Sequence, residues 1–155
     1  MIDEISLKIL TILQKKARIP NVEVARQVDM APSAVLERIR KLENNGYIDG
    51  YEVRLNPEKF KRNLVAFITI RVKAAANMTA IGNLLSAIPE VQEAHHITAE
   101  DGFLVKVRVA DVSDLGKMIR EKVRTIPEVN QTRTAVAMTT FKETARIPID
   151  AEDIM

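Results

Sequence analysis

The residues best suited to recognise another molecule lie in one short segment, residues 32–44. Five polar or charged residues recur there at steps of four, three, one and three, which places them on one face of a helix: Ser33, Glu37, Arg40, Lys41 and Asn44. Three apolar residues form a stripe on the opposite face: Val35, Ile39 and Leu42. A helix that packs on one side and carries hydrogen-bond donors and acceptors on the other can enter the major groove of DNA.

Most amphipathic helices with a charged side simply face solvent, so the context of this segment matters. A second predicted helix precedes it at residues 21–28, and only three residues separate the two. Positive charge is also concentrated here. Residues 14–41 contain seven Lys and Arg against three Asp and Glu, a local excess of four, whereas the whole chain has a net charge of +2. Together these features favour a helix-turn-helix that binds DNA.

His95 and His96 are the only feature that invites a metal-binding or catalytic interpretation. Adjacent residues of a strand point to opposite faces, so the two imidazoles cannot chelate one ion together. The chain has no cysteine, and it lacks a Gly-rich phosphate loop, a nucleophile motif and a metal-ligand helix motif. We therefore predict that the protein is not an enzyme and needs neither a metal nor a cofactor.

Composition limits the class of protein further. The chain has 155 residues, of which 46% are apolar and 28% charged, as expected of a folded protein. No segment approaches the ~20 apolar residues of a membrane-spanning helix, and the start lacks the basic region of a secretory signal. We therefore expect a cytoplasmic protein without disulfides.

Three helices are predicted in the first fifty residues. The first spans about residues 3–16, with an aspartate as its cap. Asn21 is expected to cap the second, Pro32 to occupy the first position of the third, and Gly46 to end it in the left-handed conformation. Residues 51–55 then alternate apolar and polar side chains, which predicts a small wing or a linking strand.

The second half of the chain repeats one pattern twice. Each copy has a β-rich run, a helical stripe, the sequence Ile-Pro-Glu-Val and a further strand, in residues 64–97 and 103–136. Two strand–helix–strand units predict a ferredoxin-like βαββαβ fold, in which two helices cover one face of the sheet. Because the other face has no covering element, we expect a partner there, most simply a second copy of the chain.

Several motifs occur in an order and spacing that are specific together. The chain has an Arg-x-x-x-Leu-Glu pattern at residues 38–43, a Gly-x-Ile-x-Gly-Tyr segment at 46–51, Leu-Asn-Pro at 55–57 and Thr-x-Thr at 132–134. In these features it resembles the Lrp/AsnC (feast/famine) family of transcriptional regulators over essentially its whole length. Where the family usually has Ser as the cap of the recognition helix, this chain has Ala31.

The resemblance implies an α+β protein with two domains. An N-terminal winged helix-turn-helix domain would span residues 1–50, followed by a linking strand and hinge. The ferredoxin-like βαββαβ domain, also called the RAM domain, would bind an effector and form oligomers. The predicted boundaries after the first domain are 51–62 for the hinge, 63–141 for the RAM domain and 142–155 for a tail. That tail could be a short helix or an arm that reaches a neighbouring subunit.

The expected function is sequence-specific DNA binding that regulates transcription. A homodimer would present two recognition helices to successive major grooves, and the resemblance implies further association into tetramers or octamers. Arginine and lysine side chains would contact phosphates or guanine, while Ser33 and Glu37 are placed to touch base edges. The predicted DNA-binding residues are Asn21, Pro32, Ser33, Ala34, Glu37, Arg38, Arg40 and Lys41.

The resemblance also implies a small-molecule effector, with an amino acid expected, bound between dimers. The predicted effector-binding residues are Thr98, Ala99, Glu100, Asp101, Gly102, Thr132 and Thr134. The family has a Gly-x-x-Asp loop where this chain has Ala99 and Gly102, so Glu100 or Asp101 would have to replace the family's aspartate. Three alternatives follow: an effector-independent regulator with a degenerate ligand site, a ligand-storage or sensing protein whose helix-turn-helix no longer binds DNA, and a siroheme decarboxylase-like enzyme that uses His95 or His96.

Overall fold

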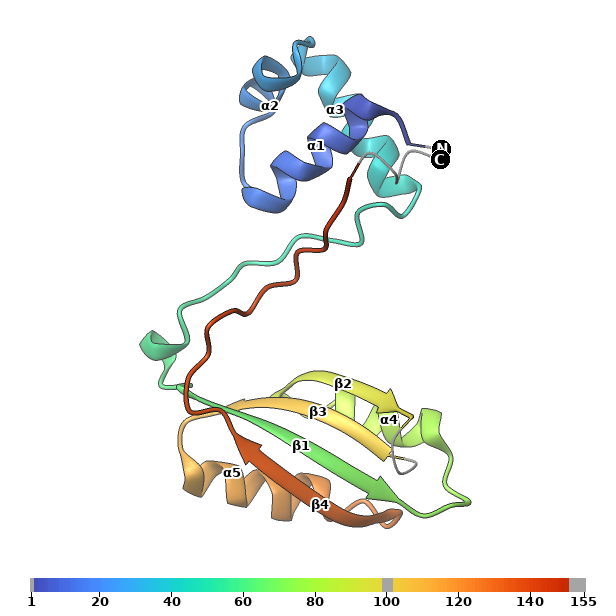
Figure 1. Cartoon of the computed structure of the whole chain (residues 1–155), viewed down its shortest axis with the longest axis vertical. Helices are drawn as coiled ribbons and strands as arrows, with labels where there is room; N and C mark the ends of the chain where they lie inside the picture. Colours follow the sequence, from blue (N-terminus) through green and yellow to red (C-terminus); the bar gives the residue numbers. More distant parts are fainter. Residues whose placement is uncertain (1, 99–101, 151–155) are drawn as a thin grey trace. The chain divides into compact units, whose positions relative to one another are not determined.

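The computed structural model describes residues 2–98 and 102–150, which form two compact units (Figure 1). The first unit, called the head here, comprises residues 1–54 together with 143–155. The second unit, called the sheet domain, comprises residues 55–142. The C-terminal segment therefore belongs to the head, although it follows the sheet domain in the chain. Within the described ranges, no helix combines the length and the apolar character needed to span a membrane.

Three helices build the head: α1 (Glu4–Lys15), α2 (Asn21–Val28) and α3 (Pro32–Asn44). Each contributes apolar residues to one buried cluster, whose members are Ile2, Ile9, Leu13, Val24, Ala25, Val35, Ile39 and Leu42. The cap predicted for the first helix is confirmed, because the amide of Ser6 donates to Oδ1 of Asp3 at 2.8 Å. The three helices predicted in the first fifty residues are therefore present, and α3 buries the stripe predicted for it, Val35, Ile39 and Leu42.

The ends of α2 and α3 correct one detail and confirm two. Asn21 does not cap α2: Pro20 stands at the cap position, and no side-chain hydrogen bond closes this helix end. The amides of Glu23 and Val24 instead donate to the carbonyl of Pro20, so the helix starts one residue earlier than the capping prediction requires. Pro32 is the first residue of α3, and Gly46 follows that helix with a φ of 73°, as predicted.

The strand predicted over residues 51–55 is wrong. This segment has no strand assignment, and it leads into the short 3-10 helix η1 (Pro57–Phe60). Alternating side chains favour an extended backbone, but a strand also needs a neighbour that pairs its N–H and C=O groups. No described part of the chain pairs with this segment, and its apolar side chains Val53 and Leu55 are exposed.

The sheet domain has four antiparallel strands in the order β2-β3-β1-β4. Their bounds are Leu64–Val72 for β1, Val91–Ile97 for β2, Gly102–Val109 for β3 and Val129–Val136 for β4. Helix α4 (Met78–Ser86) joins β1 to β2. Helix α5 (Val112–Met118) and the π-helical turn η2 (Ile119–Val123) join β3 to β4. This is the predicted βαββαβ arrangement.

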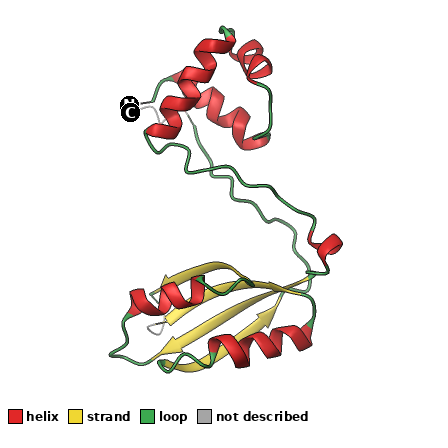
Figure 2. Cartoon of the chain, turned by 180° about the vertical axis from the view of Figure 1, so that it is seen from behind, coloured by secondary structure: helices red, strands yellow, loops and turns green. Residues whose placement is uncertain are grey.

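Both helices cover the same face of the sheet (Figure 2). The fully buried side chains of Ile68, Ile70, Val105 and Val107 come from the two central strands and belong to one apolar cluster with residues of α4 and α5. Residues that alternate with these point to the other face. No described helix covers that face, although Val65 and Lys106 on it are buried. Its central pairs include Phe67 with Lys106 and Thr69 with Leu104. The sheet domain thus has one covered and one open face, as expected.

Candidate DNA-binding face and effector site

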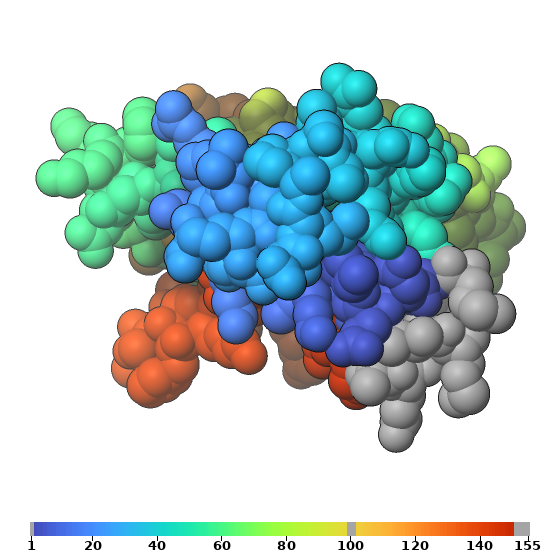
Figure 3. All heavy atoms as spheres, turned by 90° about the horizontal axis from the view of Figure 1, so that it is seen from above, coloured from blue at the N-terminus to red at the C-terminus, as the bar shows by residue number. Residues whose placement is uncertain are grey.

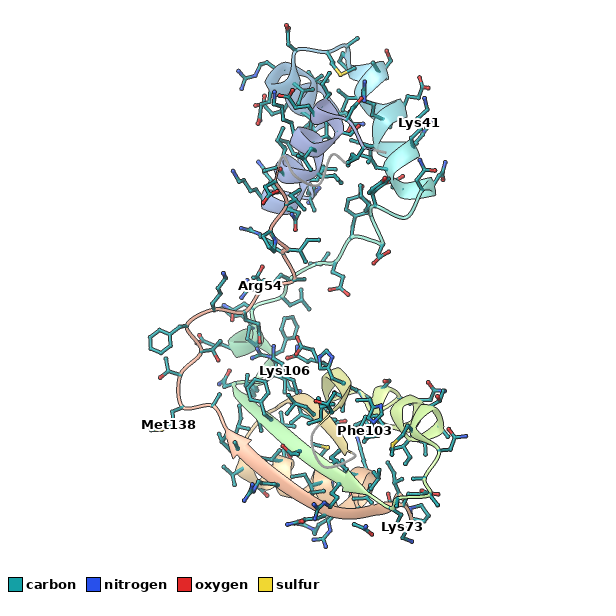
Figure 4. All side chains as sticks on the ribbon, turned by 45° about the vertical axis from the view of Figure 1, so that its right-hand side comes forward. Lys41, Arg54, Lys73, Phe103, Lys106 and Met138 are labelled. Carbon is teal, nitrogen blue, oxygen red and sulfur yellow. The ribbon has the colours of Figure 1, made fainter. Side chains whose placement is uncertain are left out.

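The outward face of α3 carries the predicted recognition residues. Val35, Ile39 and Leu42 are at most 6% exposed, so the helix packs firmly against α1 and α2. The residues on its opposite side are all exposed: Ser33, Glu37, Arg40, Lys41 and Asn44. Lys41 projects away from the head in Figure 4, and the atoms of α2 and α3, light blue to cyan, form a continuous surface in Figure 3. One helix therefore separates packing from recognition.

An ion pair lies in the middle of this face. Nζ of Lys41 is 2.8 Å from a carboxylate oxygen of Glu37, one helical turn away. The hydrogen bond from Lys41, followed by its charge, lowers the pKa of Glu37 below the usual value of a glutamate. A DNA phosphate has to compete with Glu37 for the ammonium group of Lys41, whereas the carboxylate can accept a hydrogen bond from the amino group of cytosine.

Arg38 has a different environment from its neighbours on α3. Its Nη1 donates to Oδ2 of Asp3 at 2.5 Å and to Oγ of Ser6 at 3.1 Å. Asp3 thus uses one oxygen to cap α1 and the other to hold α3. The DNA contact predicted for Arg38 stays a prediction, and these two hydrogen bonds fix α3 against the start of α1. Both partners of Arg38 lie more than thirty residues away in the chain, so the sequence pattern did not indicate them.

The charge on Asp3 is stabilised by these contacts. The hydrogen bond from the amide of Ser6, followed by that from Arg38, lowers the pKa of Asp3 from 3.8 to about 2. Asp3 and Arg38 also line an open hollow of about 450 Å³ between the start of α1 and α3, together with Glu37, Lys41 and other residues. The hollow borders the recognition face and gives solvent access to the Asp3–Arg38 pair, so we expect this pair to be partly screened.

A second contact holds the chain that leaves α3. The hydroxyl of Tyr51 donates to Oε1 of Glu43 at 2.9 Å, and burial together with Glu43 raises the pKa of Tyr51 to about 12. This contact gives a physical role to the last residue of the Gly-x-Ile-x-Gly-Tyr segment. The hydrogen bond of Tyr51 fixes the segment that follows α3 against the last turn of that helix.

The remaining predicted DNA-binding residues lie at the two helix starts. Asn21 is the first residue of α2, and Pro32, Ser33 and Ala34 form the first turn of α3. Ala31, at the cap position of α3, provides no side-chain hydrogen bond. Amides in the first turn of a helix have no intrahelical partner, so they suit a phosphate oxygen.

The described members of the predicted effector set lie in two groups at one end of the sheet, with β1 between the groups. Thr98 follows β2 and Gly102 begins β3, while Ala99, Glu100 and Asp101 lie outside the described residues. Gly102 pairs with Arg71 of β1, and the preceding residue of β1, Ile70, pairs with Thr132 of β4. Since β1 separates β3 from β4, roughly 10 Å of sheet lies between the two groups.

The threonines and histidines are assigned to faces of the sheet by its register. Thr132 and Thr134 pair with Ile70 and Ile68, so both hydroxyls are on the face that the helices cover. His95 pairs with Leu104 on the open face, as the alternation of the strand requires. His96 is on the covered face, where its ring centroid is 5.3 Å from that of Phe103. No group of acidic, histidine or cysteine side chains in the described residues could hold a metal ion.

Two family models match this chain. Residues 2–49 match a winged helix-turn-helix DNA-binding model, and residues 65–147, more than half of the chain, match the Lrp/AsnC ligand binding domain. The chain belongs to the Lrp/AsnC family. This Lrp/AsnC regulator is 36% identical over 150 residues to the leucine-responsive regulatory proteins of Escherichia coli K12 and of Klebsiella pneumoniae. Each alignment covers 96% of this chain and 92% of the relative.

Solved structures agree with this assignment. A transcriptional regulator from Neisseria meningitidis, crystallised with L-Met, matches with a TM-score of 0.90 at 26% identity over 96% of this chain and 97% of its own. AsnC of E. coli matches with a TM-score of 0.85 at 26% identity over 96% and 99%. The protein is a DNA-binding transcriptional regulator with a ligand-binding domain. The siroheme decarboxylase alternative finds no support, because these relatives are transcriptional regulators.

Replacing Asp3 by Asn should destabilise the head near neutral pH. Asn can still cap α1, but it has no charge for Arg38, and we expect a loss of about 1 kcal/mol because the pair is partly exposed to solvent. The folded-state pKa of Asp3 is lowered, so its contribution is present above about pH 4 and disappears as the pH falls towards 2. Urea unfolding of both proteins, followed by circular dichroism across this range, measures the difference.

Asp49→Asn is the control, because Asp49 is exposed in the loop after α3. Asp49→Asn should have the same free energy of unfolding as the wild type at every pH in this range. A difference between Asp3→Asn and the wild type that stayed constant down to pH 2 would show that the charge of Asp3 does not stabilise the head.

Proposed function

We propose that this Lrp/AsnC regulator binds specific DNA sequences through the outward face of α3. The observation that carries the proposal is the division of α3 into a buried apolar stripe and an exposed face that includes Arg40 and Lys41. Arg40 and Lys41 contact phosphates or guanine, and Ser33 and Glu37 lie against base edges. Arg38 orients the helix from behind through Asp3.

The proposed working unit is a homodimer built on the open face of the sheet. Phe67 is 39% exposed at the centre of this face, beside the half-buried Leu104, although both belong to otherwise well-packed central strands. Pairing two such faces would bury these side chains and bring two heads into one assembly. Two recognition helices can then reach successive major grooves, roughly 34 Å apart. Further association into tetramers or octamers belongs to the same proposal.

The proposed effector is an amino acid that binds between dimers at the end of the sheet near Thr98, Gly102 and Thr132. Two observations support it: the match to a ligand-binding domain, and the L-Met complex of the Neisseria regulator with the same fold. Within one chain β1 separates the two groups of residues, which favours a site completed by a second subunit. The effector changes DNA binding by preferring one assembly state over another. We place this regulation in the cytoplasm.

An effector-independent regulator is the second candidate. It is favoured by one observation, the presence of Ala99 and Gly102 where the family has Gly-x-x-Asp. Gly102 has no side chain to bind an ammonium group, and its backbone is committed to the first pair of β3 with β1. The ligand screen described below distinguishes the two candidates.

Replacing both Arg40 and Lys41 by Ala should weaken DNA binding and reduce its dependence on salt. Each lost phosphate contact lowers the slope of log K against log salt by about 0.9, because fewer counterions are released. Fluorescence anisotropy of a labelled duplex from the chain's own upstream region, measured at several salt concentrations, gives affinity and slope together.

The control is a double variant of Lys117 and Arg120, which removes the same charge from exposed positions of the sheet domain. It should leave the slope unchanged. If the α3 variant kept both the affinity and the slope of the wild type, α3 would not be the DNA-binding helix.

Replacing Phe67 by Glu should dissociate the dimer. A carboxylate at the centre of the open face would lose its hydration when two faces meet. A pair with Lys106, which lies opposite position 67 on β3, would not offset the several kcal/mol that this desolvation costs. Sedimentation velocity reports the mass of the assembly. Val112→Glu, at an exposed position on α5, should keep the wild-type mass. An unchanged mass for Phe67→Glu would place the dimer interface elsewhere.

A thermal-shift screen of the common amino acids tests the effector. At a free concentration of 100 times Kd, a ligand specific for the folded state stabilises it by about 2.7 kcal/mol, which raises the melting temperature by several degrees. Replacing both Thr132 and Thr134 by Ala should abolish the shift, whereas Thr139→Ala, just beyond β4, should retain it. If no amino acid shifts the melting temperature while DNA binding is intact, the regulator is effector-independent.

A further inference from the structure

The end of α1 holds another segment of the same chain. The carboxamide of Gln14 makes two hydrogen bonds to the backbone of one residue, Ile147: Nε2 donates to its carbonyl oxygen at 3.0 Å, and Oε1 accepts from its amide at 2.9 Å. In addition, Nη2 of Arg146 donates to the carbonyl oxygen of Lys15 at 3.3 Å. Figure 1 shows the dark red C-terminal segment beside α1, and both belong to the head.

The carboxamide of Gln14 binds the backbone of Ile147 with the same pair of hydrogen bonds that a neighbouring strand residue would make. In an extended chain, the N–H and C=O of one residue point to the same side, and a glutamine carboxamide offers one acceptor and one donor to match them. Pro148 follows Ile147 directly, and a proline disfavours the helical conformation of the residue before it. Ile147 is thereby held in the conformation that Gln14 can bind.

Arg146 adds a contact of a different kind. Lys15 is the last residue of α1, and the last four carbonyls of a helix have no partner within the helix. A cation at this end is also favoured by the helix dipole. The guanidinium of Arg146 supplies both a donor and a positive charge. By contrast, the side chain of Ile147 is 65% exposed, so the contact depends on its backbone and not on its side chain.

Because of this contact, the head and the sheet domain are connected by two segments of the chain. The match to the ligand-binding domain extends to residue 147, whereas residues from 143 onward belong to the head in the structure. The chain therefore passes between the units twice, once near residue 54 and again near residue 142. The second passage starts from β4, the strand that carries Thr132 and Thr134.

We propose that residues 143–150 form a C-terminal strap, which binds to Gln14 and the end of α1 in the same chain and gives the head a second attachment to the sheet domain. A head attached at two points samples fewer orientations than a head on one linker. When both heads of a dimer bind one DNA, heads attached at two points lose less conformational entropy than heads attached by one linker. The strap also connects β4 directly to the head. This consequence rests on the proposed function; the binding of the strap does not.

Limited digestion of the full chain with trypsin tests the strap. The bond after Arg146 should be cut slowly, because a protease needs a released backbone and that of Ile147 is engaged by Gln14. The bond after Lys142, in the exposed segment before the strap, is the reference within the same molecule. Replacing Gln14 by Ala removes two hydrogen bonds, so cleavage after Arg146 should accelerate about tenfold relative to Lys142. Mass spectrometry of early time points gives both rates.

Two control variants isolate the cause. Gln27→Ala removes an exposed glutamine of α2 and should leave both cleavage rates unchanged. In Ile147→Ala, trypsin should still cut slowly after Arg146, because Gln14 binds only the backbone of residue 147. Gln14→Glu keeps the size of the side chain but has no donor for the carbonyl of Ile147, so it should give faster cleavage without loss of the helical circular dichroism signal. If wild-type Arg146 is cut as fast as Lys142, or if Gln14→Ala has no effect, the strap is overturned.

Dilution separates binding within a chain from binding between chains. Protection of Arg146 that does not change on dilution supports the strap as proposed, while protection that falls would assign the segment to a second chain and overturn it. DNA affinity then tests the consequence: Gln14→Ala should weaken binding of a duplex that spans two grooves about 3- to 10-fold, with the salt slope retained. If Gln14→Ala is cut faster after Arg146 but binds the duplex as tightly as the wild type, the strap does not assist DNA binding.

Discussion

The packing of Val35, Ile39 and Leu42 against α1 and α2 decides which residues of α3 face outward. Because these three side chains are almost fully buried, the helix cannot rotate without exposing them to water, at a cost of about 1.5–3 kcal/mol for each. Arg38, beside these apolar residues on α3, also restricts rotation of the helix through its ion pair with Asp3. The outward face of α3, which we propose binds DNA, therefore has a fixed orientation within the head.

The same principle organises the sheet domain. Ile68, Ile70, Val105 and Val107 bury one face of the sheet beneath α4 and α5, and the alternation of each strand sends the intervening side chains to the open face. An element that packs on one side leaves the other available for recognition. In the head, the exposed face of α3 includes the charged side chains of Arg40 and Lys41, which suit a nucleic acid. In the sheet domain, Phe67 and Leu104 are apolar side chains of the open face, through which we propose that two copies of the chain associate.

Elements that bury one face could be predicted from the sequence, because burial requires apolar residues at regular spacing. This is why α1, α3 and all four strands were predicted. Prediction failed where a partner far away in the chain decides the outcome. Residues 51–55 alternate like a strand, but no described part of the chain pairs with them. A second failure is local: the residue types did not show that Pro20, and not the adjacent Asn21, takes the cap position of α2. The contacts of Arg38 with Asp3 and of Gln14 with Ile147 leave no periodic trace at all.

The absence of cysteine from the chain allows the most direct test of how α3 is presented. Single cysteines would replace Ser33 and Asn44 on the outward face of α3, and Val112 on the sheet domain as a reference. The rate of alkylation by iodoacetamide would be measured with and without a saturating DNA duplex. The account predicts that DNA slows alkylation at positions 33 and 44 and leaves position 112 unchanged. Equal rates with and without DNA at both α3 positions, under conditions where the duplex is bound, would contradict it.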